Sequence, residues 1–366
     1  MSFTKINHYE KEYLDEHHDS ALNVTSGVAD QPIVNPHFVR RKKRALSTPQ
    51  YVEGILRGDI TTLSQAITLI ESSNPDHYAQ AQEIIEKCLP HAGKSVRIGI
   101  TGVPGAGKST FIEAVGNMVT SLKHKLAVLA IDPSSERSGG SILGDKTRME
   151  SISSNPKVFI RPSPSAGSLG GVAEKTREAM LLCEAAGYDV IIIETVGVGQ
   201  SETAVAGMTD IFCLLQLPNA GDDLQAIKKG IMEIADLIVI NKADINPQAA
   251  NVARSQIKSA LGMLRHASPN WTPPVLMLSA LQMQGIAEFW NTIENYRSTM
   301  QRSGEFEARR RHQARAWMWE LIDQGLRARF ASHARVQHDL PGLQAAVEAG
   351  QTTPSAAAMR LLGYLG

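Results

Sequence analysis

Short apolar runs alternate with longer amphipathic stretches through the middle of the chain. Seven runs are typical of buried strands, at residues 96–100, 127–131, 158–160, 190–193, 211–217, 237–240 and 275–278. Strands that are apolar throughout and separated by helices belong to a largely parallel sheet covered on both faces. We therefore expect an α/β fold over residues 95–303, with its ligand site beyond the carboxyl ends of the strands.

Helical spacing of apolar residues continues on both sides of this region. Before it, apolar residues recur at steps of three and four from Ile60 to Ile70, which predicts an N-terminal helical extension over 46–94. After it, an Arg- and Ala-rich stretch predicts a C-terminal helical extension over 304–366, packed on the main domain or used for dimerisation. Residues 1–45 are polar without periodicity, so we expect a flexible arm there.

Charge and composition argue against several classes of protein for this chain. The 37 basic side chains of the 366-residue chain balance 37 acidic ones, so no overall field attracts nucleic acid or anionic lipid. No apolar stretch approaches the roughly 20 residues of a membrane span, and the acidic N-terminus lacks the features of a transit or secretory signal. The three cysteines lack metal-ligand spacing and are expected to be reduced, buried thiols. We predict a cytoplasmic protein that binds neither nucleic acid nor membrane.

The clearest chemical signal is a glycine-rich loop between the predicted strand 96–100 and a helix that begins near Thr110. It matches the pattern G-x-x-x-x-G-K-S through Gly102, Val103, Pro104, Gly105, Ala106, Gly107, Lys108 and Ser109. Such a loop turns backbone N–H groups toward phosphates, while its lysine neutralises the β- and γ-oxygens and its serine hydroxyl binds Mg²⁺. The position of the loop between strand and helix predicts a nucleoside triphosphate site.

A second loop selects the base. Asn241, Lys242, Ala243 and Asp244 directly follow the predicted strand 237–240. An Asp carboxylate there accepts hydrogen bonds from N1–H and the exocyclic amine of guanine, whereas adenine has no proton at N1. The simpler explanation of this tetrapeptide is a helix N-cap, but downstream of a phosphate loop we favour GTP and GDP.

Two further groups complete the expected nucleotide site. Backbone N–H groups of Ser279, Ala280 and Leu281, after the predicted strand 275–278, are candidates to contact guanine O6. For Mg²⁺ we expect oxygen ligands from Ser109, from Asp132 and Glu194 at strand ends, and from Asp145 in the loop Gly139 to Arg148. Of the acidic residues, Asp145 is the weakest candidate, because a loop Asp is often only a turn former.

The segment after Glu194 has the character of a switch. Glu194-Thr195-Val196-Gly197 stands where many regulatory GTPases carry D-x-x-G, so Gly197 is expected to donate its N–H to the γ-phosphate. Gln does not follow Gly197 directly, which leaves the residue that positions the attacking water unassigned; Gln200 is one candidate.

Together these residues resemble the MeaB/ArgK-type GTPases associated with methylmalonyl-CoA mutase. The similar stretches cover most of 95–245 and are Gly102 to Ser109, Ile131 to Ser135, Gly139 to Met149, Arg161 to Gly171, Leu181 to Glu202, Gly221 to Gly230 and Asn241 to Asp244. The resemblance implies a P-loop GTPase that acts as a chaperone of an adenosylcobalamin-dependent acyl-CoA mutase. Such a chaperone gates cofactor loading and protects or reactivates the mutase.

The resemblance also assigns roles to single residues. It places Asp132, Asp145 and Glu194 in the metal and switch apparatus. We expect Lys108, Glu194 and Asp145 to be the catalytic residues. It implies that Asp222 and Lys228 belong to a mobile segment that responds to the mutase, and that the C-terminal helices hold a homodimer.

Three other functions share parts of this pattern. A nickel-insertion GTPase uses the same nucleotide logic but needs a Cys/His ligand cluster, whereas here only His17 and His18 are adjacent. An ATP-dependent kinase is disfavoured by Asn241 to Asp244. A scaffold that binds nucleotide without hydrolysing it is disfavoured by Lys108, Ser109 and the acidic metal candidates.

Overall fold

A computed structural model describes residues 46–72, 74–131, 149–162, 169–195, 201–218, 229–264 and 268–365. From Leu46 onward the chain forms one compact unit. The flexible arm predicted for 1–45 lies outside the described residues. Cys88, Cys183 and Cys213 are free and buried, as expected. No helix in the described part of the chain is long and apolar enough to cross a membrane.

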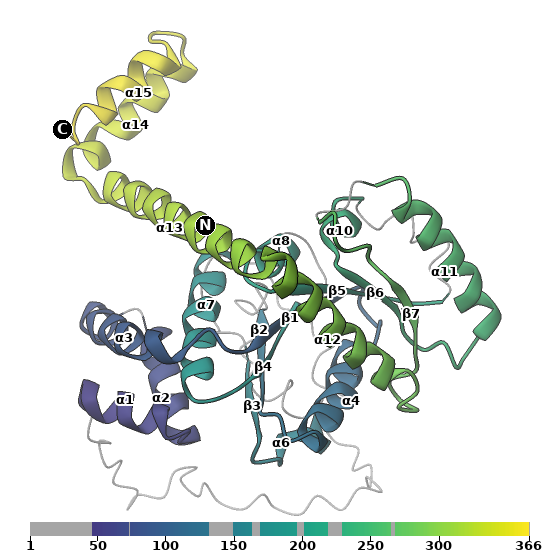
Figure 1. Ribbon diagram of the computed structural model, residues 1–366. Coiled ribbons are helices and arrows are strands. Elements are labelled where there is room, and N and C mark those ends of the chain that lie inside the picture. The colour runs from purple at the N-terminus through teal and green to yellow at the C-terminus, as the bar shows by residue number, and fades with distance from the viewer. Residues whose placement is uncertain are drawn as a thin grey trace, which may run out of the picture. The chain divides into compact units, whose positions relative to one another are not determined.

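The centre of the molecule is a seven-stranded parallel sheet in the order β3-β2-β4-β1-β5-β6-β7 (Figure 1). Its strands are β1 (Val96–Gly102), β2 (Leu126–Ile131), β3 (Val158–Arg161), β4 (Val190–Thr195), β5 (Ile211–Gln216), β6 (Leu237–Ile240) and β7 (Val275–Met277). All seven coincide with the predicted apolar runs, with small differences at their ends, so the predicted fold class is confirmed. The strand that carries the phosphate loop, β1, lies at the centre of the sheet.

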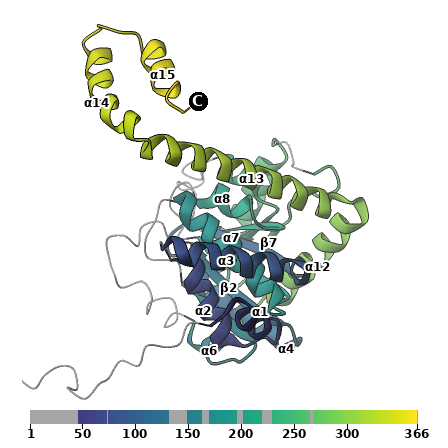
Figure 2. The ribbon, with the colours of Figure 1, turned by 90° about the vertical axis from the view of Figure 1, so that its left-hand side faces the viewer.

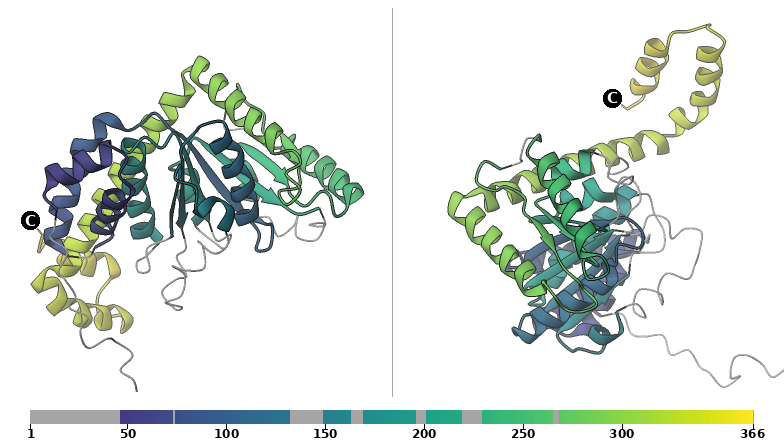
Figure 3. Two further views of the ribbon diagram at one scale, coloured as in Figure 1. Left: turned by 90° about the horizontal axis from the view of Figure 1, so that it is seen from below. Right: turned by 90° about the vertical axis from the view of Figure 1, so that its right-hand side faces the viewer.

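Helices cover both faces of the sheet (Figure 3, left). One face packs against α4 (Lys108–Ser121), α6 (Glu150–Ser153) and α12 (Ile286–Ser303). The other face packs against α7 (Leu169–Ala185), α8 (Ser201–Ala206), α10 (Lys229–Ile234) and α11 (Pro247–Leu261). Because successive side chains of a strand point to opposite faces, Ile98 and Ile192 join the first core while Ile191 and Ile193 join the second.

The predicted N-terminal extension consists of α1 (Thr48–Leu56), α2 (Ile60–Ile70), α3 (Pro75–Cys88) and a 3₁₀ turn, η1 (Leu89–His91). Capping residues mark the helix starts, since Asp59 and Asn74 each accept a hydrogen bond from a backbone N–H of the first turn. These helices pack beside α7, so their apolar residues extend the core on that face of the sheet (Figure 2).

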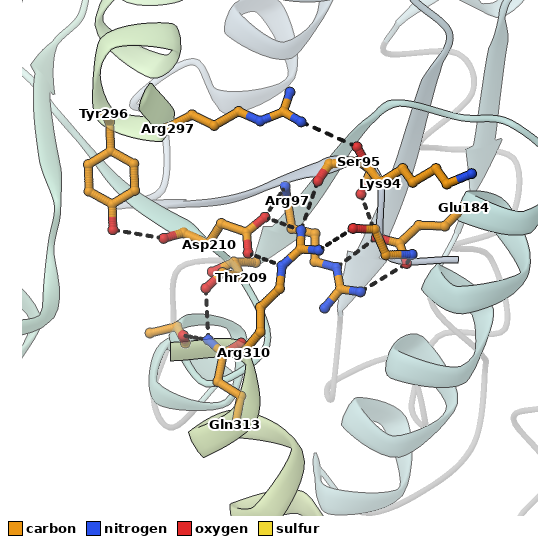
Figure 4. Close-up of polar contacts among 12 residues, drawn as sticks. Lys94, Ser95, Arg97, Glu184, Thr209, Asp210, Tyr296, Arg297, Arg310 and Gln313 are labelled. Carbon is orange, nitrogen blue, oxygen red and sulfur yellow. Dashed lines mark hydrogen bonds and ion pairs between the residues drawn. The ribbon is translucent and has the colours of Figure 1, made fainter. Parts of the chain in front are cut away.

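The C-terminal extension consists of α13 (Glu305–Ser332), α14 (Ala334–Glu348) and α15 (Pro354–Leu362). The first turns of α13 are fixed to the amino ends of the strands through a network of ion pairs (Figure 4). Arg310 binds both carboxylate oxygens of Asp210, each at 2.7 Å, and Arg97 binds both of Glu184. This network lies at the end of the sheet opposite the phosphate loop.

Candidate functional site

The phosphate loop has the backbone conformation that its glycines allow. It runs from the end of β1 to Gly107, and α4 begins at Lys108. Gly105 and Gly107 have φ values of 80° and 85°, which non-glycine residues rarely adopt. A Cβ at Gly107 would also lie 2.7 Å from the amide nitrogen of Asn241. Glycine is therefore required at Gly107 both by the backbone and by the neighbouring base loop.

The side chain of Lys108, the first residue of α4, reaches back to the start of this loop. Its Nζ donates a hydrogen bond to the Gly102 carbonyl at 2.8 Å. Burial lowers the pKa of the Lys108 ammonium, while the carboxylates of Glu194 and Glu202 act in the opposite direction. The two carboxylates thus favour the charged form of the ammonium. Ser109 follows at the N-terminus of α4 and is partly buried.

Asn241 connects the phosphate loop to both loops that are expected to hold the base. Its side chain is 2 % exposed, and its Nδ2 donates to the carbonyl of Ala106 at 2.8 Å. Its Oδ1 accepts from the backbone N–H of Lys242 at 2.9 Å and of Ala280 at 3.1 Å. One amide side chain therefore fixes three loops relative to one another.

Asp244 lies beside the loop that follows β7. Its carboxylate accepts a hydrogen bond from Nε2 of Gln282 at 3.2 Å, and it remains partly exposed. The backbone N–H of Ser279 bonds to the Gln284 carbonyl, and that of Ala280 bonds to Asn241. Leu281, the third residue predicted to contact guanine O6, is 82 % exposed. The structure thus brings the two predicted base loops together at the carboxyl edge of the sheet.

Glu194 is the penultimate residue of β4, the strand adjacent to β1, and its Cα pairs with that of Ile100. The next residue, Thr195, is buried and donates from its hydroxyl to that of Thr101 at 2.9 Å. This bond holds β4, which carries the Glu194 carboxylate, beside β1, which leads into the phosphate loop. The sheet therefore places Glu194 and Lys108 at one edge, although they are 86 positions apart in the sequence.

Comparisons with known proteins agree with this geometry. Residues 63–335 match the family described as "Methylmalonyl Co-A mutase-associated GTPase MeaB". The chain belongs to this family.

Individual relatives support the assignment. "GTPase ArgK" of Escherichia coli is 50% identical over 268 residues, which cover 73% of this chain and 81% of the relative. "Methylmalonic aciduria type A homolog, mitochondrial" of Mus musculus is 46% identical over 322 residues, covering 84% and 77%. The solved structure described as "Crystal structure of LAO/AO transport system kinase" is 38% identical with a TM-score of 0.71, covering 88% of this chain and 99% of that one. The chain is a GTPase with the P-loop fold.

Several residues predicted for this MeaB-family site are not part of the described structure. They are Asp132, Asp145, Gly197, Gln200, Asp222 and Lys228. Among the residues that are described, no three His, Cys, Asp or Glu side chains come together as a metal-binding group. Of the four residues predicted to bind Mg²⁺, the structure describes Ser109 and Glu194, whereas Asp132 and Asp145 lie outside the described residues.

Two residues near the site were not assigned from the sequence. Glu202, in α8, is 3 % exposed, and its carboxylate acts to raise the pKa of Lys108. Gln282 contacts Asp244. Neither stands in a motif with a fixed chemical role, and only the folded sheet brings them to the nucleotide edge. A weak signal existed for Glu202, which is an acidic residue at the end of a stretch that resembles the family.

Proposed function

We propose that this GTPase is a chaperone of an adenosylcobalamin-dependent acyl-CoA mutase, methylmalonyl-CoA mutase or a relative. In this role it gates loading of the cofactor and protects or reactivates the mutase. The observation that carries the proposal is the match of residues 63–335 to a family named for its association with that mutase. The joining of the phosphate and base loops through Asn241 supports the underlying GTP site.

In the proposed site, the residues from Gly102 to Thr110 surround the phosphates of GTP. Lys108 would exchange its hydrogen bond to the Gly102 carbonyl for bonds to phosphate oxygens. Phosphate oxygens carry more negative charge than a carbonyl oxygen, so they bind the ammonium more strongly. Asp244 would accept from N1–H and the amine of guanine, beside Lys242. Because the Ser279 and Ala280 amides are already bonded, Leu281 is the remaining candidate donor to guanine O6.

The donor set fits Mg²⁺, because a hydroxyl and carboxylates are the oxygen ligands that this ion prefers. Ser109 would bind it directly, and Asp132, Asp145 and Glu194 would bind it directly or through water. When bound, the ion neutralises charge that develops on the phosphates during hydrolysis. Glu194 and Asp145 would act with Lys108 in hydrolysis, and Gly197 would report the presence of the γ-phosphate.

A homodimer is the second part of the proposal. Trp319, Ile322 and Leu326 are 61 %, 39 % and 56 % exposed on α13. At 100° per residue, helical spacing puts them on the side of α13 opposite Gln313 and Trp317, which contact the GTPase domain. A row of large apolar side chains facing away from its own domain is typical of a surface that another protein covers. We assign this surface to a second copy of the chain.

The experiment for the mutase role is GTP turnover with and without the mutase from the same source. We expect the mutase to stimulate the wild type, whereas Lys108→Ala should be inactive under both conditions because it lacks phosphate neutralisation. Lys228→Ala should keep the unstimulated rate and lose the stimulation, since a coupling residue must contact partner or nucleotide differently in the GTP and GDP states. Lys258→Ala, on α11, is the matched surface control.

The chaperone role, the phosphate site and the coupling role of Lys228 would each be contradicted by a different result. If no adenosylcobalamin-dependent acyl-CoA mutase changes turnover or associates with the chain, the chaperone role is wrong while the GTPase stands. If the folded Lys108→Ala protein hydrolyses GTP at the wild-type rate, the phosphate site itself is misplaced. Full stimulation of Lys228→Ala would show that Lys228 is only a surface lysine.

A further inference from the structure

A cavity of about 300 Å³ lies between the GTPase domain and α13, away from the nucleotide edge. Residues of α7, α13, the turn η1 and the segment after α8 form its walls. Most of the lining is apolar and comes from Leu89, Met180, Leu181, Met208, Ala314 and Trp317. This volume is at the lower end of the range for small-molecule sites.

Three polar side chains in the lining already have their partners, as Figure 4 shows for Arg97, Arg310 and Gln313. Arg97 binds the carboxylate of Glu184 with two hydrogen bonds. Arg310 binds Asp210 and the carbonyls of Gly93 and Ser95. Gln313 donates to the Thr209 carbonyl at 2.8 Å. These ion pairs and hydrogen bonds hold the three side chains in place, so that they shape the wall of the cavity.

Arg177, on α7, is different. It is 9 % exposed, yet its Nε and Nη1 have no hydrogen-bond partner within the described part of the chain. Its Nη2 reaches the Gly207 carbonyl only at 3.4 Å, and the carboxylate of Glu320 lies 3.6 Å from Nη1. The guanidinium lies over the Trp317 ring at 5.5 Å, and the indole N–H of Trp317 also has no partner among the described residues.

A buried guanidinium with unmet donors is costly, because a charged group taken out of water needs acceptors to replace its hydration. Burial lowers the pKa of Arg177 for the same reason, against an opposing effect of Glu320. Glu320 is a poor substitute for a full partner, since its side chain is 47 % exposed and stands beyond hydrogen-bond distance. An acceptor oxygen that enters the cavity would satisfy the arginine.

We propose that this cavity binds a small carboxylate with an aliphatic body, whose carboxylate pairs with Arg177 and whose chain packs on the apolar walls. A carboxylate suits a guanidinium because it offers two oxygens to its N–H groups. A second copy of the chain is the less favoured occupant, because the apolar row of Trp319, Ile322 and Leu326 faces the other side of α13. The site would connect α13 to Gly207 and Met208, directly after α8.

The proposal is tested by titrating the full-length protein with octanoate and with octan-1-ol, which share an eight-carbon body and differ in charge. Calorimetry should show saturable binding of octanoate, about tenfold or more tighter than that of octanol. Arg177→Gln should remove this preference. Lys175→Gln, which makes the same charge change on α7 outside the cavity, should retain it.

A second variant allows the proposal to be tested even if Arg177→Gln does not fold. Ala314→Phe fills the cavity from α13 and leaves Arg177 in place, so it should weaken binding of both probes. The proposal is overturned if the wild type does not bind octanoate saturably, as would happen if a partner subunit filled the cavity. It is equally overturned if Arg177→Gln and Ala314→Phe, both folded, bind octanoate as the wild type does.

Discussion

Asn241 shows how one buried side chain can organise a ligand site. Asn241 belongs to the motif that is predicted to hold guanine, and in the structure its amide is bonded to Ala106, Lys242 and Ala280. These bonds position three loops, while the carboxylate of Asp244, the residue predicted to bind the base, is partly exposed. The two residues of one motif therefore differ in function, and substitutions at each should have different consequences.

Asp244→Asn should change which base is bound. The variant keeps one acceptor but presents an amide where guanine places a donor, and xanthine carries an oxygen at C2 that accepts from this amide. We expect GTP affinity to fall by about 10- to 100-fold, as for loss of a hydrogen bond to a charged group, and XTP affinity to rise. Competition binding with GTP and XTP measures this. Unchanged GTP preference would contradict the placement of the base, and Asp76→Asn on α3 is the control.

Asn241→Ala should instead weaken the structure and the site together. It leaves the Ala106 carbonyl and the Ala280 N–H without their partner, and each buried unsatisfied group costs about 1–3 kcal/mol. Urea unfolding should show a loss of stability in that range, together with lower affinity for GTP and XTP alike. Asn251→Ala, at an exposed position of α11, should change neither quantity. A stable Asn241→Ala protein with normal GTP binding would remove the positioning role.

At the scale of elements, paired charges join α7 to β1 and α13 to the residue before β5. The carboxylates of Glu184, on α7, and Asp210, before β5, are almost completely buried and each accepts two hydrogen bonds from an arginine. Losing one partner of such a pair costs more than the pair itself contributes, because the other charge stays buried. The junction is thus held by groups that must all keep their charge.

This requirement predicts a dependence on pH. Burial alone would raise the pKa of Glu184, but hydrogen bonds and charge from Arg97 hold it below the usual value of 4.5. A carboxyl with a depressed pKa contributes stability above its unfolded pKa and loses it as pH falls through the folded one. Glu184→Gln should therefore be less stable than wild type at pH 7, and the difference should shrink below about pH 4.5.

Urea unfolding from pH 7 to pH 3 measures the effect. Glu83→Gln serves as the control, because Glu83 also has a lowered pKa but its side chain is half exposed, so solvent weakens its interactions. A stability difference for Glu184→Gln that stays constant with pH would show that the ion pair with Arg97 does not stabilise the fold.

At the scale of the whole molecule, α13 has two sides with different tasks. One side contacts the GTPase domain through Arg310, Gln313 and Trp317, and the other exposes Trp319 and Ile322 with their apolar neighbours. Phe306 is the one buried residue among the 28 of this fully described helix. A helix of this length with so little burial in its own chain gains stability when a partner covers it.

The proposed dimer should therefore depend on this surface. Leu326→Glu places a charge within the apolar row, where dimerisation would have to bury it without a partner, so the variant should be monomeric. Light scattering coupled to size exclusion should give twice the chain mass for wild type and the chain mass for the variant. Arg327→Glu, which helical spacing turns away from the row, should remain dimeric. A wild-type monomer, or a dimer that tolerates Leu326→Glu, would contradict the assignment.

The sequence by itself determined the sheet and the chemistry of its loops. Buried parallel strands must be apolar along their whole length, so all seven are visible as runs in the sequence. The loop from Gly102 to Ser109 was equally visible, because close approach to phosphate restricts which residues fit. The placement of Asp244 beside guanine stays a prediction, although the structure brings its loop to the correct edge.

Only the tertiary structure decided which distant residues meet. The bonds of Asn241 to Ala106 and Ala280, the contact of Gln282 with Asp244, and the cavity around Arg177 depend on strand order and on where α13 packs. Local sequence patterns report the periodicity of one element, whereas these contacts join elements far apart in the chain. A polar residue such as Arg177 looks the same in sequence whether its partners are present or missing, because burial and hydrogen bonding are properties of the assembled fold.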